Sequence, residues 1–137
     1  MTAADQTRRD AEDGPPVMVL ADDDEDARSL LARSARAAGF RIYEASTGSA
    51  LIACVRRLLA RGEKIGIVLS DVNMPECDGI DATKELLGLN SSLRNVLMTA
   101  VASAAVVQRA LQAGAKAVLC KPIAVSAVLA LVSTVTR

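Results

Sequence analysis

Residues 65–79 have the sequence IGIVLSDVNMPECDG and contain a strand signal, a carboxylate and a turn in that order. The run from Ile65 to Ser70 is short, aliphatic and β-branched, which predicts a strand buried on both faces. Asp71 follows the run directly. The M-P and D-G pairs that come next are typical of a turn and of a helix start. The segment therefore predicts a strand that ends at a carboxylate and leads into a helix.

The same strand-to-helix unit recurs on both sides of this segment. Short apolar runs alternate with stretches whose apolar residues have helical spacing. Because parallel strands are joined by right-handed crossovers through helices, this order predicts an α/β fold, a doubly wound five-stranded parallel sheet with five helices of flavodoxin-like (βα)5 type. Strands are expected at Val17 to Ala21, Arg41 to Glu44, Ile65 to Ser70, Asn95 to Thr99 and Ala117 to Cys120. Helices are expected from the acidic cluster after the first strand to Gly39, from Ser46 or Thr47 to near Gly62, and at Ile80 to Leu89, Ser103 to Ala113 and Val125 to Thr136.

The apolar stripe of the first helix is predicted to contain Leu30 and Leu31, followed by Ser34, Ala35 and Ala38 at helical spacing. This stripe should face the sheet.

The chain is predicted to form one domain over residues 17–137, preceded by a polar and flexible leader over residues 1–16. The leader has no apolar core and so does not resemble a signal peptide. The longest apolar stretch, Ile123 to Val135, is interrupted by three hydroxyl residues and is shorter than the roughly 20 residues of a spanning helix. We therefore expect no membrane insertion.

Composition excludes several kinds of chemistry. The chain has no histidine, which removes Ser-His-Asp and Cys-His catalysis and histidine-ligated metals within it. Cys54, Cys77 and Cys120 are far apart and form no C-x-x-C pair, so a zinc site or a disulfide framework is not indicated and a reducing, cytoplasmic location is expected. One Phe, one Tyr and no Trp argue against an aromatic platform for nucleic acid.

Charge is distributed unevenly although 16 Lys and Arg balance 16 Asp and Glu. No carboxylate occurs after Glu85, and the five cations of that part of the chain are scattered. Five scattered charges are too few for a nucleic-acid patch, so we expect no nucleic-acid binding by this chain.

Charged and hydroxyl residues follow the predicted strands at their carboxyl ends, where open α/β sheets bind ligands. Carboxylates without His or Cys beside them are the ligands of Mg2+ or Mn2+. One carboxylate at such a site can accept a phosphoryl group, while a Lys and a hydroxyl meet the charge on its oxygens. The pattern therefore predicts phosphoryl transfer to an Asp. The residues are Asp22 and Asp23 after the first strand, Asp71 after the third, Thr99 at the end of the fourth and Lys121 after the fifth.

On these residues, the LSDVNMPECDG segment, Thr99-Ala100 and Lys121-Pro122, the chain resembles receiver domains of two-component response regulators. It is similar to single-domain chemotaxis-type regulators from about Pro16 to Arg137. The resemblance implies that Asp71 is the phosphoacceptor and that Thr99 and Lys121 contact the phosphoryl group. It also implies a cis bond between Lys121 and Pro122, and a Mg2+ (or Mn2+) site made by Asp22, Asp23, Asp71 and the main-chain carbonyl of Asn73.

The resemblance also implies partners and a mode of action. A sensor histidine kinase or a histidine phosphotransfer protein would donate the phosphoryl group, and the chain would catalyse only its own phosphorylation and dephosphorylation, so it would not be an enzyme. The sequence itself adds a further expectation: residues 103–136 have no carboxylate and contain apolar residues such as Val107 and Leu131, so this segment is expected to form a contact face for a homodimer or a target protein. Val118 stands where the family often has an aromatic switch residue, Ile123 where it often has Phe, and Val101 where hydrolytic water approaches, so the switching mechanism and the phosphate lifetime are expected to differ.

Two alternatives remain. The first is an Asp-nucleophile phosphatase of haloacid dehalogenase type, although Glu25 and Asp26 follow Asp24 where such enzymes have D-x-D-x-T/V. The second is a degenerate receiver that serves only as an interaction module. The sequence also leaves open whether the chain is a stand-alone regulator or the receiver of a longer protein.

Overall fold

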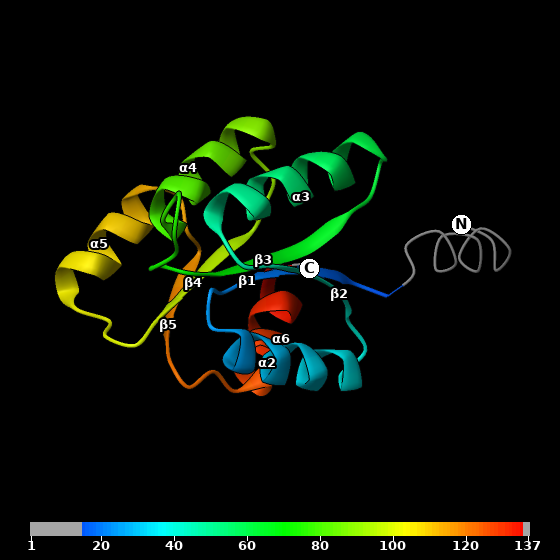
Figure 1. The fold of residues 1–137 in the computed structure, drawn as a ribbon, viewed down its shortest axis with the longest axis horizontal. Helices are drawn as coiled ribbons and strands as arrows, with labels where there is room; N and C mark the ends of the chain where they lie inside the picture. The colour runs from blue at the N-terminus through cyan, green and yellow to red at the C-terminus, as the bar shows by residue number, and fades with distance from the viewer. Residues whose placement is uncertain (1–14, 136–137) are drawn as a thin grey trace, which may run out of the picture.

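The computed structural model describes residues 15–135, and strands alternate strictly with helices over this range (Figure 1). A flexible leader was predicted at residues 1–16, and its first 14 residues lie outside the described range. Thr136, the expected end of the last helix, also lies outside it. The elements are β1 (Val17–Ala21), α2 (Glu25–Ala37), β2 (Arg41–Ala45), α3 (Gly48–Ala60), β3 (Ile65–Asp71), α4 (Gly79–Leu89), β4 (Asn95–Thr99), α5 (Ala104–Gln112), β5 (Ala117–Cys120) and α6 (Val125–Val135).

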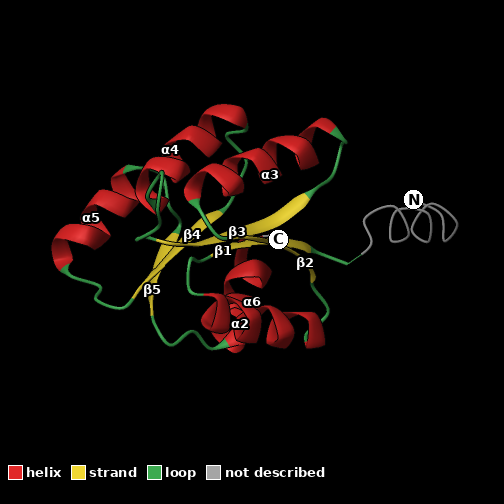
Figure 2. Cartoon of the chain, viewed as in Figure 1, coloured by secondary structure: helices red, strands yellow, loops and turns green. Residues whose placement is uncertain are grey.

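The strands form one parallel sheet in the order β2-β1-β3-β4-β5, with β1 as the point where the chain reverses direction across the sheet. Helices α2 and α6 cover one face, and α3, α4 and α5 cover the other (Figure 2). The predicted doubly wound (βα)5 fold is therefore confirmed.

The sheet is most deeply buried along its middle strands. Every residue of β1 and β4 is buried, whereas the outer strands β2 and β5 are largely half-buried or exposed. One core cluster packs β1, β3 and β4 against α2 and α6, and includes Met18, Phe40 and Val128. The opposite face packs against α3, α4 and α5 through two clusters. The carboxyl ends of the middle strands are thus held in a well-packed frame.

Several element boundaries differ by one residue from the sequence-based expectation. Strand β2 extends to Ala45, and β3 extends to Asp71, so this carboxylate belongs to the strand itself. Helix α4 begins at Gly79, because the Asp78 side chain accepts a hydrogen bond from the Asp81 N–H and so caps it. Ser103 is likewise the cap of α5 and not part of it.

The predicted stripe of α2 was partly wrong. Leu30 is 65% exposed, and Ser34 and Ala38 are also exposed. The buried positions are instead Ala32 and Ala35. These small side chains allow the helix to approach the sheet closely, and the larger Leu30 side chain lies outside the contact between helix and sheet.

Gly79 lets helix α4 begin directly against the end of β3. A Cβ atom at this position would lie 2.2 Å from the carbonyl oxygen of Asp71 and 2.9 Å from Leu97 Cδ2. Its N–H donates to the carbonyl of Val72. The glycine of the D-G pair is therefore required because the start of α4 packs directly against the Asp71 main chain and the Leu97 side chain.

Among residues 15–135, no helix combines the length and the apolar character that crossing a bilayer requires.

Candidate functional site

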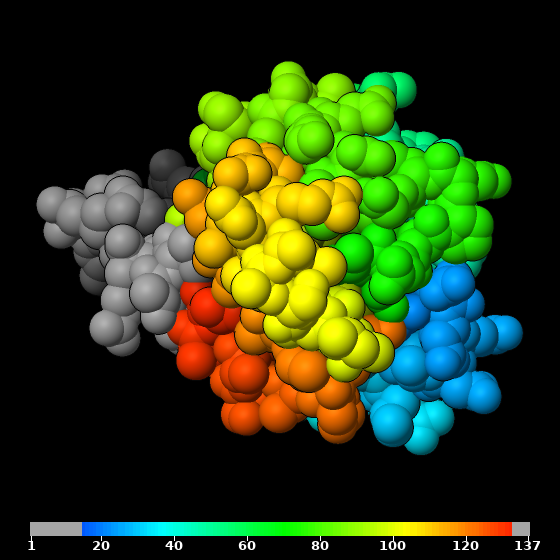
Figure 3. Space-filling model, turned by 90° about the vertical axis from the view of Figure 1, so that its left-hand side faces the viewer, coloured from blue at the N-terminus to red at the C-terminus, as the bar shows by residue number. Residues whose placement is uncertain are grey.

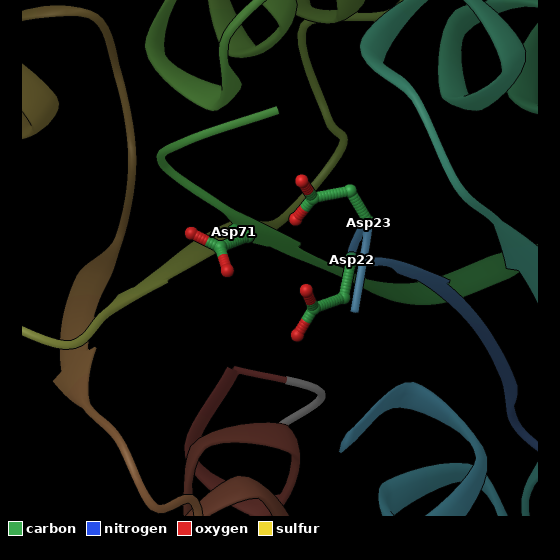
Figure 4. Close-up of side chains that lie close together, drawn as sticks. All are labelled: Asp22, Asp23 and Asp71. Atoms are coloured by element: carbon green, nitrogen blue, oxygen red, sulfur yellow. The ribbon is translucent and has the colours of Figure 1, made fainter. Parts of the chain in front are cut away.

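Three carboxylates from two neighbouring strands converge at the carboxyl edge of the sheet. Asp22 and Asp23 follow β1, and Asp71 is the last residue of β3. One oxygen atom from each lies within 4.8 Å of the others, and all three side chains reach toward the same space (Figure 4). Asp22 and Asp71 are buried, at 2% and 6% exposure, while Asp23 is exposed. The sequence-predicted acidic group is therefore brought together by the fold.

Lys121 provides the counter-charge for the two buried carboxylates. Its Nζ donates to Asp22 Oδ2 at 2.8 Å and to Asp71 Oδ2. The bond between Lys121 and Pro122 is cis, as the resemblance to receiver domains implied, and the Lys121 N–H donates to the carbonyl of Thr99. Burial disfavours the ammonium ion, but its hydrogen bonds to the two carboxylates outweigh this and raise the pKa of Lys121.

The ionised form of the Asp71 carboxyl is disfavoured by its surroundings, so its pKa is raised. Burial is the largest effect and raises its pKa, and the nearby Asp22 acts in the same direction. The Lys121 ammonium and the Asn73 N–H, which donates to Asp71 Oδ1 at 2.9 Å, oppose this rise but do not cancel it. The site therefore favours any further positive charge or hydrogen-bond donor placed beside Asp71.

Asp22 is held through its main chain as well as its side chain. Its N–H donates to the carbonyl of Ala45 at 3.1 Å, and its own carbonyl accepts from Arg28 Nη1 at 2.7 Å. Its Oδ1 accepts from the Asp24 N–H at 3.0 Å. Arg28 was not among the residues predicted for the site. Its signal is a cation in the first turns of a helix with an acidic start, where the helix dipole disfavours positive charge.

Thr99 ends β4, next to β3 in the sheet, and is 3% exposed. Its hydroxyl is turned toward the following loop, where it donates to the carbonyl of Val101 at 3.2 Å and accepts from the Val101 N–H at 3.3 Å. A cavity of about 350 Å³ lies beside it and is also lined by Asn73 and Arg109. The fold thus brings Asp22, Asp23, Asp71 and Lys121 together, and places Thr99 and Asn73 at the border of this group.

A second groove opens from the other side of the carboxylates. It has a volume of about 510 Å³ and passes between α2 and the loop that joins β5 to α6. Asp22 and Lys121 line its polar part, and the rest is mostly apolar. The apolar residues include Leu30, Leu31 and Ile123, with Ala27, Met98 and Pro122.

The elements α5, β5 and α6, which contain no carboxylate, lie together on the face of the molecule that Figure 3 shows in yellow, orange and red. Val118, at the position of the expected aromatic ring, is half-buried and packs against the cluster under α4 and α5. Val101 is 71% exposed, and Leu111 and Leu129 are 50% and 38% exposed.

The donor set fits a hard divalent cation. It consists of oxygen atoms only, and three carboxylates crowded within 4.8 Å repel one another unless a cation lies among them. The Lys121 ammonium, which lies against two of them, confirms that this place favours positive charge. The residues present are therefore suited to Mg2+ or Mn2+.

Comparison with known proteins gives consistent results. A family model described as the response regulator receiver domain matches residues 18–133. The chain is 30% identical over 121 residues to the chemotaxis protein CheY of Thermotoga maritima, which covers 88% of this chain and 97% of that protein. It is 36% identical over 107 residues to the transcriptional regulatory protein ZraR of Salmonella typhimurium, which covers 77% of this chain. The chain spans only 23% of the length of ZraR.

Solved structures agree on the fold. One of these is a chain in the crystal structure of the CheX-CheY-BeF3-Mg+2 complex of Borrelia burgdorferi. The present chain superposes on it with a TM-score of 0.81 and 25% identity, and the match covers 90% of the present chain and 91% of the Borrelia chain. A response regulator protein from Burkholderia pseudomallei, whose structure has a phosphorylated aspartic acid, a calcium ion and citrate, gives a TM-score of 0.74 at 26% identity, covering 88% of this chain and 71% of that one.

Proposed function

Because the chain belongs to the response regulator receiver domain family, we propose that it accepts a phosphoryl group on Asp71 from a phosphohistidine of a partner protein. The observation on which this rests is the pair of buried carboxylates, Asp22 and Asp71, bridged by the Lys121 ammonium beside a third carboxylate. A buried, strained carboxylate with a cation in contact is suited to nucleophilic attack on phosphorus. We take residues 17–137 as the receiver.

In the transfer step an oxygen of Asp71 attacks phosphorus. A P–O bond forms while the P–N bond to the donor imidazole breaks, and the imidazole, protonated on its other nitrogen, leaves with the electron pair. Lys121 pairs with an oxygen of the transferred group. Thr99 exchanges its contact with Val101 for a contact with a second phosphoryl oxygen, a rotation about its side chain that the adjacent cavity permits.

Asp22, Asp23, Asp71 and the carbonyl of Asn73 would hold the metal ion. Mg2+, when bound, supplies charge neutralisation for the phosphoryl oxygens. The Borrelia structure contains Mg+2 with BeF3, and the Burkholderia structure contains a calcium ion and a phosphorylated aspartic acid. Both support a metal ion beside the phosphoacceptor in this chain.

The groove beside Lys121 supports docking of the phosphohistidine donor, a sensor histidine kinase or a histidine phosphotransfer protein. Leu30 lines this groove and is 65% exposed, so the face offers apolar surface directly next to the carboxylates. A helix that carries the phosphohistidine could bury this surface while its imidazole points at Asp71. Free Cys54, Cys77 and Cys120 support a reducing, cytoplasmic setting for the exchange.

Phosphorylation adds a charge of about −1.5 to −2 at the acidic edge. We assign the response to the face made by α5, β5 and α6, a contact surface for a homodimer or a target protein. Since Val118 has replaced the expected ring, the change there would take the form of helix repacking and not of an aromatic rotamer switch.

The test is phosphorylation of the purified chain by a small phosphodonor, acetyl phosphate, with Mg2+, followed by intact mass spectrometry. The wild type and Asp78→Asn should each gain one phosphoryl group, because the Asp78 carboxylate caps α4, a role that Asn also fills, and is not among the three clustered carboxylates. Asp71→Asn should gain none. Equal labelling of Asp71→Asn would overturn the assignment. No labelling of the wild type would favour the degenerate receiver, and repeated turnover of a phosphate ester would favour the phosphatase.

A further inference from the structure

We propose that Arg28 is a positioning residue for the metal site, acting through the main chain of Asp22; this inference rests on the proposed function of that site. Arg28 Nη1 donates to the carbonyl oxygen of Asp22 at 2.7 Å. Its Nε donates to Glu44 Oε1 at 3.1 Å. The guanidinium therefore joins the end of β2 to the peptide that links Asp22 and Asp23.

The location of Arg28 is unfavourable for the helix alone. It lies in the N-terminal part of α2, where the helix dipole favours acidic residues such as Glu25 and Asp26 and disfavours a cation. Its side chain is only 15% exposed, so its charge is also largely removed from water. The contacts with Glu44 and with the Asp22 carbonyl offset both costs.

The contact fixes the orientation of two metal-binding side chains at once. The N–H of Asp22 is bound by the carbonyl of Ala45, and its carbonyl is bound by Arg28. The peptide groups on both sides of the Asp22 Cα are therefore held from the β2 side, which restricts the backbone of Asp22 and the orientation of the peptide that leads to Asp23. The backbone orientation sets the positions from which the two carboxylate side chains start. A planar, forked donor is needed here, because one side chain must reach two acceptors in different directions.

Two more exposed arginines that also form ion pairs at β2 serve as controls. Arg36 pairs with the same Glu44, at 3.4 Å, and Arg41 forms an ion pair with Glu63, also at 3.4 Å, from the other end of β2. Neither contact involves Asp22. If Arg28 only stabilised the fold, its removal would lower the melting temperature but leave the Mn2+ affinity as unchanged as in these two controls. A positioning role also lowers the Mn2+ affinity.

The experiment measures the Mn2+ dissociation constant, from the EPR amplitude of free Mn2+, together with thermal unfolding by circular dichroism. Arg28→Met should bind Mn2+ about tenfold more weakly than the wild type, the usual effect of removing a partner that orients a metal ligand. Arg36→Gln and Arg41→Gln should stay within about twofold of the wild type. Asp71→Asn, which removes a proposed ligand, is the reference for loss of the site.

The outcomes separate this inference from the proposed function. Mn2+ binding by Arg28→Met within twofold of the wild type, with binding lost in Asp71→Asn, would overturn the positioning role alone. Absence of Mn2+ binding by the wild type would overturn the metal site and this inference with it. If Arg28→Met does not fold, Arg28→Lys replaces it. The single ammonium should keep the pairing with Glu44 and the melting temperature, but the variant should bind Mn2+ more weakly than the wild type. Unchanged Mn2+ affinity of Arg28→Lys would overturn the positioning role.

Discussion

Two buried polar residues at opposite ends of the sheet, Asp22 and Asn95, differ in how completely their polar atoms are hydrogen-bonded. Asp22, at the carboxyl edge, has its N–H, its carbonyl and both carboxylate oxygens in hydrogen bonds. Asn95, where β4 begins, is 1% exposed, and among the described residues neither its Nδ2 nor its Oδ1 has a hydrogen-bond partner.

The difference indicates where polar burial serves a function. At Asp22 each contact restricts the direction of a carboxylate that the proposed chemistry needs. At Asn95 the amide is desolvated without compensation, a state that costs stability. Removing a partner of the buried carboxylates should therefore destabilise the fold, whereas removing an unpaired polar group or an unfavourable buried charge should stabilise it. The following predictions test this from the largest effect to the smallest.

Lys121→Met should destabilise the fold by about 3 kcal/mol at neutral pH in metal-free buffer, because it leaves Asp22 and Asp71 buried and facing each other without a counter-charge. The loss should shrink on acidification, since the pKa of Asp71 is already raised by burial and rises further without the ammonium. Urea denaturation measured with and without Mg2+ checks this. Added Mg2+ should stabilise Lys121→Met more than the wild type, and an equal gain in both would contradict the shared role of the two cations.

Asn95→Leu should stabilise the fold by about 1 kcal/mol, because an apolar side chain of similar size removes two unpaired polar atoms from the core. The control is Thr83→Val. Thr83 is equally buried, but its hydroxyl donates to the carbonyl of Gly79 at 2.8 Å, so its removal should cost about 1 kcal/mol. Chemical denaturation of both variants gives the comparison, and a destabilised Asn95→Leu would show that its amide has a partner in solution.

Asp71→Asn should stabilise the metal-free fold at neutral pH, by on the order of 1 kcal/mol. Burial raises the pKa of Asp71 above that of the unfolded chain, so its protonated form is favoured in the fold. Its contribution is therefore present below the unfolded pKa of about 3.9 and is lost as the pH rises through the folded pKa. The advantage of Asp71→Asn should accordingly appear as the pH rises from the acid range. A pH-independent difference between the two proteins would show that charge is not its cause.

Much of the fold and of the site was predictable from the sequence. The strand runs locate the carboxyl ends, and residues at these ends meet by topology, which is why Asp22, Asp71 and Lys121 could be grouped across 100 residues. Helix caps such as Asp24 and Thr47 are also local signals.

Other features depend on information that spacing does not contain. The rotation of the Thr99 hydroxyl toward Val101 is a side-chain choice among several. The exposure of Leu30 depends on how closely Ala32 and Ala35 approach the sheet. The contact between Arg28 and Asp22 depends on the edge strand β2, whose Glu44 holds the guanidinium. Such contacts between distant elements require the assembled structure.

The strictly parallel sheet also has a consequence for the long-range field of the molecule. Because every strand runs in one direction, the acidic loops that follow β1 and β3 lie at one end of the sheet. Cations that directly precede strands, Lys64, Arg94 and Lys116, lie at the other end. Among residues 15–135, carboxylates therefore predominate at the carboxyl ends of these strands, although Lys121 lies there too and Glu63 lies before β3. The proposed phosphorylation of Asp71 would add negative charge at this acidic end and so strengthen its field toward an approaching charged molecule.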